Sequence, residues 1–92
     1  MTRNLLFTKQ FKKDYKRMAK RGADMALLDA VIDQLRTGGT LDPKYRDHML
    51  SGDYANHHEC HIKPDWLLIY YMEEDTVVLA LTRTGTHNDL FS

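Results

Sequence analysis

Apolar and polar positions in the first half of the chain predict a short strand followed by two amphipathic helices. The apolar run of residues 4–8 is typical of a strand, and its last residue can cap the next helix. That helix carries an apolar stripe at helical spacing, formed by Phe11, Tyr15 and Met18. A second helix follows a possible N-cap at Asp24 and stops at the glycine pair 38–39; its stripe contains Leu28, Val31, Ile32 and Leu35. We expect the two helices to form an antiparallel pair.

The second half of the chain predicts three consecutive strands. They span residues 57–63, 66–72 and 77–84, with Pro64 ending the first and a polar hairpin turn at 73–75 preceding the last. Residues 40–52 are irregular and place His48 in a surface loop, and residues 85–91 allow no more than one helical turn. The order β-α-α-β-β-β predicts an α+β fold, with a mostly antiparallel sheet, two N-terminal helices packed on one face and the opposite face open.

The strand at 57–63 gives its two faces different chemistry. Side chains alternate along a strand, so one face would carry only ionisable groups, namely His57, Glu59, His61 and Lys63. The other face, formed by His58, Cys60 and Ile62, suits a core. We therefore expect one face to pack and the other to face solvent or a charged substrate.

Length and composition indicate one domain, residues 1–92, in a reducing compartment. A chain of 92 residues is too short for two domains and long enough to fold without metal or disulfides. Its one cysteine, Cys60, excludes an internal disulfide framework. No signal peptide and no apolar run of the ~18 residues that span a bilayer are present. We expect a cytoplasmic protein with no membrane partner.

Charge is unevenly distributed although the chain is neutral overall. Between Lys9 and Arg21, seven basic residues accompany one acid, Asp14, which gives this segment a net charge of +6. Such a patch can face phosphates, and a solvated helix face is an equally good interpretation.

The cluster of histidines raises the possibility of a metal site, and the spacing argues against it. Residues 58–61 are one position short of the HExxH zinc signature, which also needs a helix rather than a strand. His57 and Glu59 resemble half of a zinc deaminase signature whose cysteine pair is missing. We therefore expect no metal and no other cofactor. A nucleophilic Cys60 is also disfavoured, because it points to the face opposite His61.

General acid–base catalysis by imidazole and carboxylate groups remains. His61 and Glu59 share a strand face, and Asp65, His48 and His87 can converge on it. Arg83 supplies a fixed cation, which phosphoryl transfer requires because charge builds on the non-bridging oxygens. Each histidine taken alone is more often a surface or hydrogen-bonded residue.

Three separated motifs resemble the YafQ branch of the RelE-type toxins. They occupy residues 44–48, 58–70 and 83–87, and a terminal Leu90-Phe91 follows. The resemblance covers essentially the whole chain and implies a small RelE-like microbial RNase fold. It also implies a ribosome-dependent, metal-independent endoribonuclease of a type II toxin–antitoxin system. Its partners would be mRNA on the ribosome, ribosomal RNA and a small dimeric antitoxin.

The resemblance also implies roles for individual residues. The acid–base set would contain His48, His61, Asp65 and His87, with Glu59 beside them where the family has Asp. Arg83 would bind the scissile phosphate and Phe91 a base. The +6 charge of the first helix separately suggests that its lysines Lys12, Lys13 and Lys16 contact ribosomal RNA. His57 and His58 would be structural or peripheral. The alternative is a non-catalytic RNA- or protein-binding module of the same fold.

Overall fold

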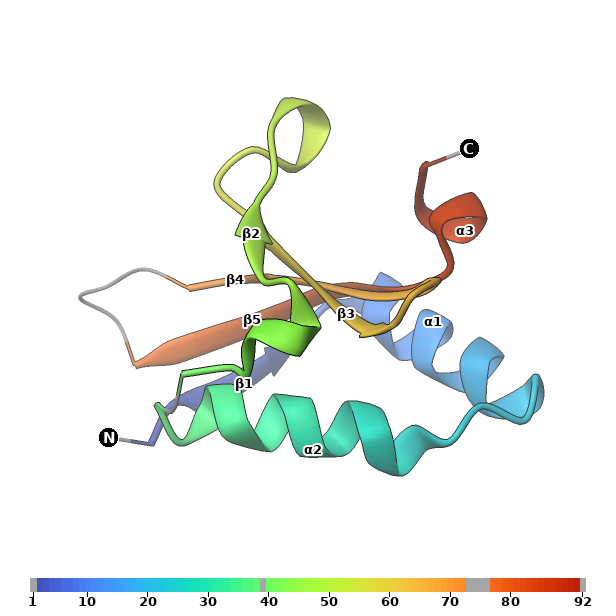
Figure 1. The fold of residues 1–92 in the computed structure, drawn as a ribbon, viewed down its shortest axis with the longest axis horizontal. Coiled ribbons are helices and arrows are strands. Elements are labelled where there is room, and N and C mark those ends of the chain that lie inside the picture. Colours follow the sequence, from blue (N-terminus) through green and yellow to red (C-terminus); the bar gives the residue numbers. More distant parts are fainter. Residues whose placement is uncertain (1, 39, 73–76, 92) are drawn as a thin grey trace.

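The computed structural model describes residues 2–38, 40–72 and 77–91. These residues form a five-stranded sheet and three α-helices, with two short 3-10 turns at Pro43–Tyr45 and Gly52–Tyr54 (Figure 1). The elements are β1 (Asn4–Phe7), α1 (Lys9–Lys20), α2 (Met25–Arg36), β2 (His48–Met49), β3 (His58–Lys63), β4 (Trp66–Tyr71), β5 (Val78–Gly85) and α3 (His87–Phe91). None of the described helices is long and apolar enough to cross a bilayer.

The sheet has the strand order β1-β5-β4-β3-β2 and confirms the predicted α+β fold. β1 runs parallel to β5 and the other pairs are antiparallel, so the sheet is mixed but mostly antiparallel. The short strand β2, which carries His48, was expected to be a loop and instead pairs with β3. The predicted turn at 73–75 and Gly39 lie outside the described residues.

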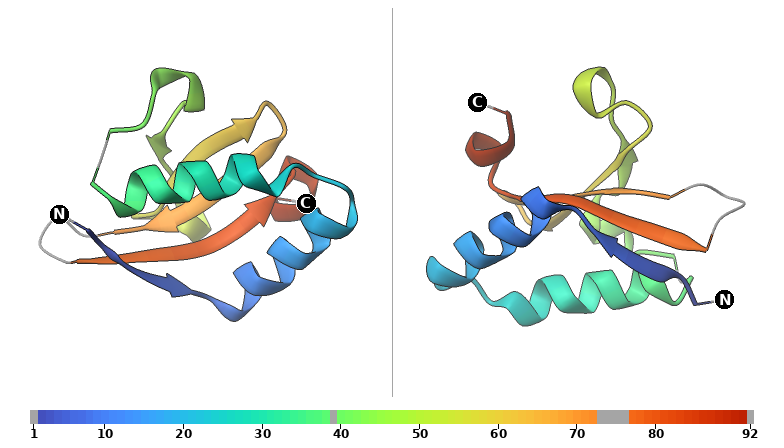
Figure 2. Two further views of the ribbon diagram at one scale, coloured as in Figure 1. Left: turned by 90° about the horizontal axis from the view of Figure 1, so that it is seen from below. Right: turned by 180° about the vertical axis from the view of Figure 1, so that it is seen from behind.

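The two long helices begin and pack as their sequences predict. Thr8 Oγ1 accepts a hydrogen bond from Phe11 N at 2.9 Å, and the Asp24 carboxylate accepts one from Ala26 N at 3.2 Å. Their apolar stripes pack against one face of the sheet, where Leu28 and Val31 are fully buried. The chain reverses direction between α1 and α2, and the helices diverge from the turn that joins them (Figure 2).

The opposite face of the sheet is partly covered rather than open. The segment around β2 and the short helix α3 rise from this face at two separate places (Figure 1). They cover a second, smaller core in which Leu67, Ile69 and Leu90 are buried against Leu50 and Tyr54. The segment around β2 and the helix α3 are therefore both packed on this face of the sheet. The side chains of Glu59 and His61 on β3 lie on the same face.

A one-residue irregularity in the pairing of β4 with β5 changes which face the end of β5 presents. Leu81 pairs with Tyr70, but the next pair is Arg83 with Ile69, so Thr82 is an extra residue. Leu81 and Tyr70 belong to the helix-side core, whereas Ile69 belongs to the core on the opposite face. The bulge therefore places Arg83 on the same face of the sheet as Ile69, whereas strict alternation would have pointed it into the helix-side core.

Beyond the bulge, Thr84 returns to the helix-side core and is fully buried. Its hydroxyl accepts a hydrogen bond from Trp66 Nε1 at 3.0 Å and donates one to the Leu67 carbonyl at 2.7 Å. Both polar groups of the hydroxyl are thus satisfied inside an apolar layer, which fixes the register of β5 against β4.

Replacing Thr84 by Val should lower the free energy of unfolding by about 1–3 kcal/mol, because the shape is kept while a buried indole N–H loses its acceptor. The exposed Thr40 provides a matched control, and Thr40→Val should change stability by no more than about 0.5 kcal/mol. Denaturant unfolding of the two variants measures both values. Equal stability for Thr84→Val and the unmodified chain would contradict a structural role for this hydroxyl.

Candidate acid–base site

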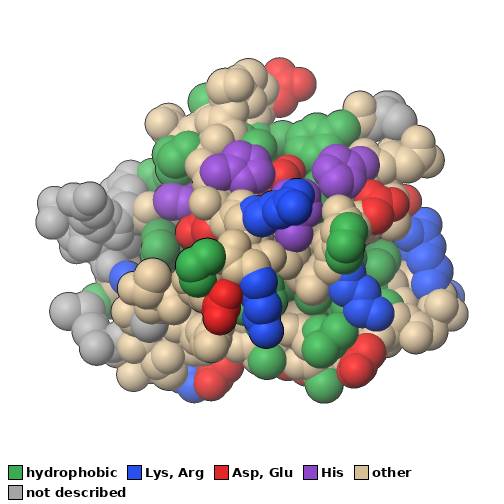
Figure 3. Space-filling model, viewed as in Figure 1, with side chains coloured by type: hydrophobic (Ala, Val, Ile, Leu, Met, Phe, Trp, Pro, Cys, Tyr) green, Lys and Arg blue, Asp and Glu red, His purple; other side chains and the backbone are tan. Residues whose placement is uncertain are grey.

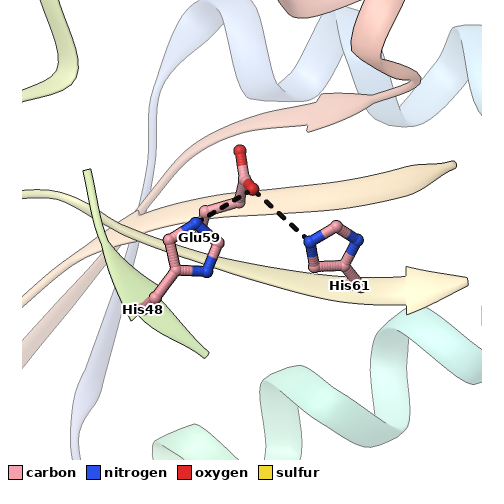
Figure 4. Close-up of side chains that lie close together, drawn as sticks. All are labelled: His48, Glu59 and His61. Atoms are coloured by element: carbon pink, nitrogen blue, oxygen red, sulfur yellow. Dashed lines mark ion pairs between the residues drawn. The ribbon is translucent and has the colours of Figure 1, made fainter. Parts of the chain in front are cut away.

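The buried carboxylate of Glu59 holds two imidazole rings together. His48 on β2 is the register partner of Glu59 on β3, and His61 lies two residues further along β3 on the same face. Their Nε2 atoms lie 3.4 Å and 3.6 Å from Glu59 Oε1 (Figure 4). The Glu59 side chain is only 6% exposed. The predicted shared face of Glu59 and His61 is present, and strand pairing adds His48 to it.

Hydrogen bonds on the far side of each ring define what these imidazoles can do. His48 Nδ1 lies 2.8 Å from the Arg46 carbonyl and His61 Nδ1 lies 3.3 Å from the Pro64 carbonyl. A carbonyl only accepts, so each Nδ1 carries its proton and each Nε2 faces the carboxylate. In each ring Nε2 is therefore the nitrogen with a free lone pair, and it lies beside the Glu59 carboxylate.

A second histidine–carboxylate pair lies beside this cluster. The His87 backbone N–H and Nδ1 both donate to Asp65 Oδ1, at 2.9 Å and 2.7 Å. These hydrogen bonds hold the pKa of Asp65 below its ordinary value, and the one from the backbone N–H has the larger effect. The carboxylate therefore stays charged beside the ring. The His87 and His61 ring centroids are 5.9 Å apart. Asp65 engages the Nδ1 of His87, so Nε2 is the ring nitrogen that this carboxylate does not use.

The short helix α3, which carries His87, is tied to the end of α1. Arg21 donates to both oxygens of Asp89, at 2.7 Å and 3.0 Å, and holds the pKa of that carboxyl well below its usual range. Asp89 also accepts from Thr86 N at 3.0 Å, in a capping arrangement. Gly85 has φ +155°, and a Cβ there would lie 2.9 Å from Asp89 Oδ2, so the position requires glycine.

Arg83 and Phe91 reach the same face and are linked by Tyr54. Arg83 Nη1 donates to the Tyr54 hydroxyl at 3.4 Å, and the Tyr54 ring meets Phe91 edge-on with centroids 6.0 Å apart. Phe91 is 49% exposed and its ring lies 6.4 Å from that of His87. A cation and an exposed aromatic ring thus flank the histidines, and groups of these two kinds can bind a phosphate and a base. Figure 3 shows histidine side chains gathered on this face together with basic side chains.

Several residues singled out in the sequence lie away from this cluster. Lys12, Lys13 and Lys16 are exposed on α1, in the helix layer. His57 and His58 pack on tyrosine rings, at 5.4 Å from Tyr71 and 5.0 Å from Tyr70. Both remain candidates for structural roles.

The cysteine is buried as predicted. Cys60 has no exposed surface. Its burial, and to a lesser extent the negative charges of Asp47 and Glu59, raise the pKa of its thiol to about 12. A thiol with that pKa is protonated at neutral pH and is a poor nucleophile.

Two residues that sequence reasoning overlooked complete the surroundings of Arg83. Asp14, buried on α1, accepts two hydrogen bonds from the guanidinium, and Tyr54 accepts a third. Asp14 gave a signal as the one acid in the basic segment, which favours an internal partner over solvent. Tyr54 gave none, because an irregular segment brings it to the site.

The Glu59 cluster also has the composition of a metal site. One ligand atom from each of His48, Glu59 and His61 lies within 4.8 Å of the others. Imidazole and carboxylate groups at such distances suit zinc or copper. Because the ligands come from two paired strands, no linear spacing in the sequence could have revealed this arrangement.

Comparison with known proteins identifies the family. The family model described as "Bacterial toxin of type II toxin-antitoxin system, YafQ" matches residues 3–92. The chain is 36% identical over 90 residues to the mRNA interferase toxin YafQ of Escherichia coli strain K12, covering 97% of this chain and 96% of that protein. It superposes on a chain of the E. coli DinJ–YafQ toxin–antitoxin complex with a TM-score of 0.91, 35% identity and complete coverage of both chains. It also superposes on a metal-bound toxin from Helicobacter pylori with a TM-score of 0.88, at 42% identity over 99% of this chain and 100% of the other. The resemblance seen in the sequence is confirmed: this chain belongs to the YafQ family of bacterial toxins of type II toxin–antitoxin systems.

Proposed function

We propose that this chain is a cytoplasmic endoribonuclease that cleaves mRNA during translation and is neutralised by an antitoxin. The observation that carries the proposal is the pair of histidine–carboxylate units whose rings, His61 and His87, lie 5.9 Å apart. At that separation a single phosphodiester can contact both rings, one as proton acceptor and the other as proton donor. The names of the E. coli relatives, an mRNA interferase toxin and a toxin–antitoxin complex, support the same assignment.

In the proposed reaction, the 2′-hydroxyl attacks the adjacent phosphorus. The Nε2 of His61 or His48, supported by Glu59, accepts the hydroxyl proton. Arg83 binds the non-bridging oxygens as charge builds on them. The bond from phosphorus to the 5′-oxygen breaks, and the Nε2 of His87, whose charged form Asp65 stabilises, donates a proton to that oxygen. The products are a 2′,3′-cyclic phosphate and a 5′-hydroxyl end.

Every proton transfer in this scheme is assigned to a side chain, and we therefore propose that cleavage needs no metal. A zinc or copper ion held by His48, Glu59 and His61 would occupy the Nε2 atoms that accept the proton. Metal binding at this cluster would then oppose catalysis.

The proposed macromolecular partners fit two adjoining surfaces, which share Lys12 and Lys16. Exposed lysines on α1 offer positive charge for ribosomal RNA. A groove of about 530 Å³ lies between β1, α1 and α2; Leu5, Phe7, Phe11, Lys12, Tyr15 and Lys16 line part of it. Its largely apolar lining beside the edge strand β1 suits a protein segment, such as part of an antitoxin.

His87→Gln should lower cleavage of a translated message by ~10²- to 10⁴-fold while ribosome binding is retained, because the amide cannot donate a proton as an imidazolium does. His57→Gln is the matched control and should cleave normally. Primer extension on programmed ribosomes measures both variants. Normal cleavage by His87→Gln would overturn the assignment of His87 as the proton donor, whereas no cleavage by the unmodified chain would favour the non-catalytic binding module.

A chelator selective for zinc and copper, such as phenanthroline, should leave cleavage within about twofold of the untreated rate. Magnesium stays in the assay because the ribosome needs it. Added zinc should inhibit, and the chelator should reverse the inhibition, because the metal competes with the proton for the Nε2 atoms. Loss of activity in the chelator alone would show that a transition metal takes part in the reaction.

Replacing Lys12, Lys13 and Lys16 together by Glu should weaken ribosome association and flatten its dependence on salt. The melting temperature should hardly change, because the three side chains are exposed. Sedimentation with ribosomes at several salt concentrations measures the slope. If the slope is unchanged but antitoxin binding falls, these lysines serve the groove rather than RNA.

A further inference from the structure

α1 takes the place of a neighbouring strand along the second half of β5. β1 pairs with β5 only from Val78 to Leu81. Beyond this point Thr8 Oγ1 donates to the Thr82 carbonyl at 2.8 Å, and the Asp14 carboxylate accepts from Thr84 N at 3.2 Å. Asp14 therefore supplies the acceptor that an adjacent strand would otherwise provide.

The same carboxylate accepts two hydrogen bonds from the guanidinium of Arg83. Arg83 Nε donates to Oδ2 at 2.7 Å and Nη2 donates to Oδ1 at 3.2 Å. Because the guanidinium is planar, fixing two of its nitrogens also fixes the third. That third nitrogen, Nη1, points to the Tyr54 hydroxyl on the site face.

The charge of Asp14 is buried but compensated. The residue has no exposed surface, and it also accepts from Arg17 Nη2 at 2.8 Å and Gln10 Nε2 at 3.1 Å. Burial raises the pKa of this carboxyl, but hydrogen bonds from Arg83, Gln10 and Thr84 outweigh it and hold the pKa below its ordinary value. Two guanidinium groups share one carboxylate, so the cluster keeps a net positive charge to offer a phosphate.

The backbone and the helix thus act together on one side chain. The bulge at Thr82 turns Arg83 toward the histidines, and Asp14 then sets the orientation of its guanidinium. We propose that Asp14 is a positioning residue for the phosphodiester, which holds Arg83 in the orientation that binds the scissile phosphate. This inference rests on the proposed function, because it assigns the phosphate to Arg83.

Single-turnover cleavage on programmed ribosomes tests the inference with Asp14→Asn, Arg83→Gln and the double variant. Asp14→Asn should lower the maximal rate by about 10- to 100-fold with little change in the ribosome concentration at half-maximal rate, because binding is kept and geometry is lost. The double variant should cleave no more slowly than Arg83→Gln alone, since Asp14 acts only through Arg83. Asp33→Asn is the matched control, because it removes an exposed ion pair with Arg36 at the same helical spacing.

A second variant keeps the test decisive if Asp14→Asn unfolds at the assay temperature. Arg83→Lys keeps the positive charge but cannot make the two-point contact, so it should lose nearly as much activity as Arg83→Gln. Full activity in Arg83→Lys, or normal cleavage by a folded Asp14→Asn, would overturn the role of Asp14. Normal cleavage by Arg83→Gln would instead overturn the assignment of the phosphate to Arg83.

Discussion

The bulge at Thr82 in β5 determines which side chains at the end of this strand enter the core and which lie on the opposite face of the sheet. Before it, Leu79 and Leu81 point into the helix-side core. After it, Arg83 points to the site and Thr84 returns to the core to accept the Trp66 indole N–H. A strand without the extra residue would bury the guanidinium and leave the indole without its acceptor, at a cost of several kcal/mol. Stability and chemistry therefore depend on the same local irregularity.

The helix layer contributes to the site although it packs on the other face. Asp14 at the middle of α1 and Arg21 at its end reach past the edge of β5 to Arg83 and Asp89. Two of the basic residues in the charged segment, Arg17 and Arg21, are thus engaged in internal ion pairs. The positive charge that α1 exposes on its outer surface comes from the lysines. The +6 of the sequence overstates the free charge of this helix.

Much of the fold could be predicted because periodicity records burial directly. The apolar stripes predicted the buried faces of α1 and α2. The alternation along β3 predicted that Cys60 lies in the core and that Glu59 lies beside His61. The pairing of β2 with β3, which brings His48 to Glu59, depends on contacts between distant segments that a local pattern does not encode. The same holds for the bulge and for Tyr54. Asp14 stood out in the sequence as the one acid among basic residues, but neither its burial nor its partner Arg83 could be predicted from it.

α3 has only five residues and carries both His87 and Phe91. A helix this short has no stability of its own in water. Its order comes from Leu90 in the small core and from the anchors at Asp65 and Asp89. A local opening of this terminal turn would displace His87 and Phe91 together while the pairing of the sheet is kept. Under the proposed function, the free energy of that opening, rather than that of global unfolding, would set the fraction of molecules able to cleave.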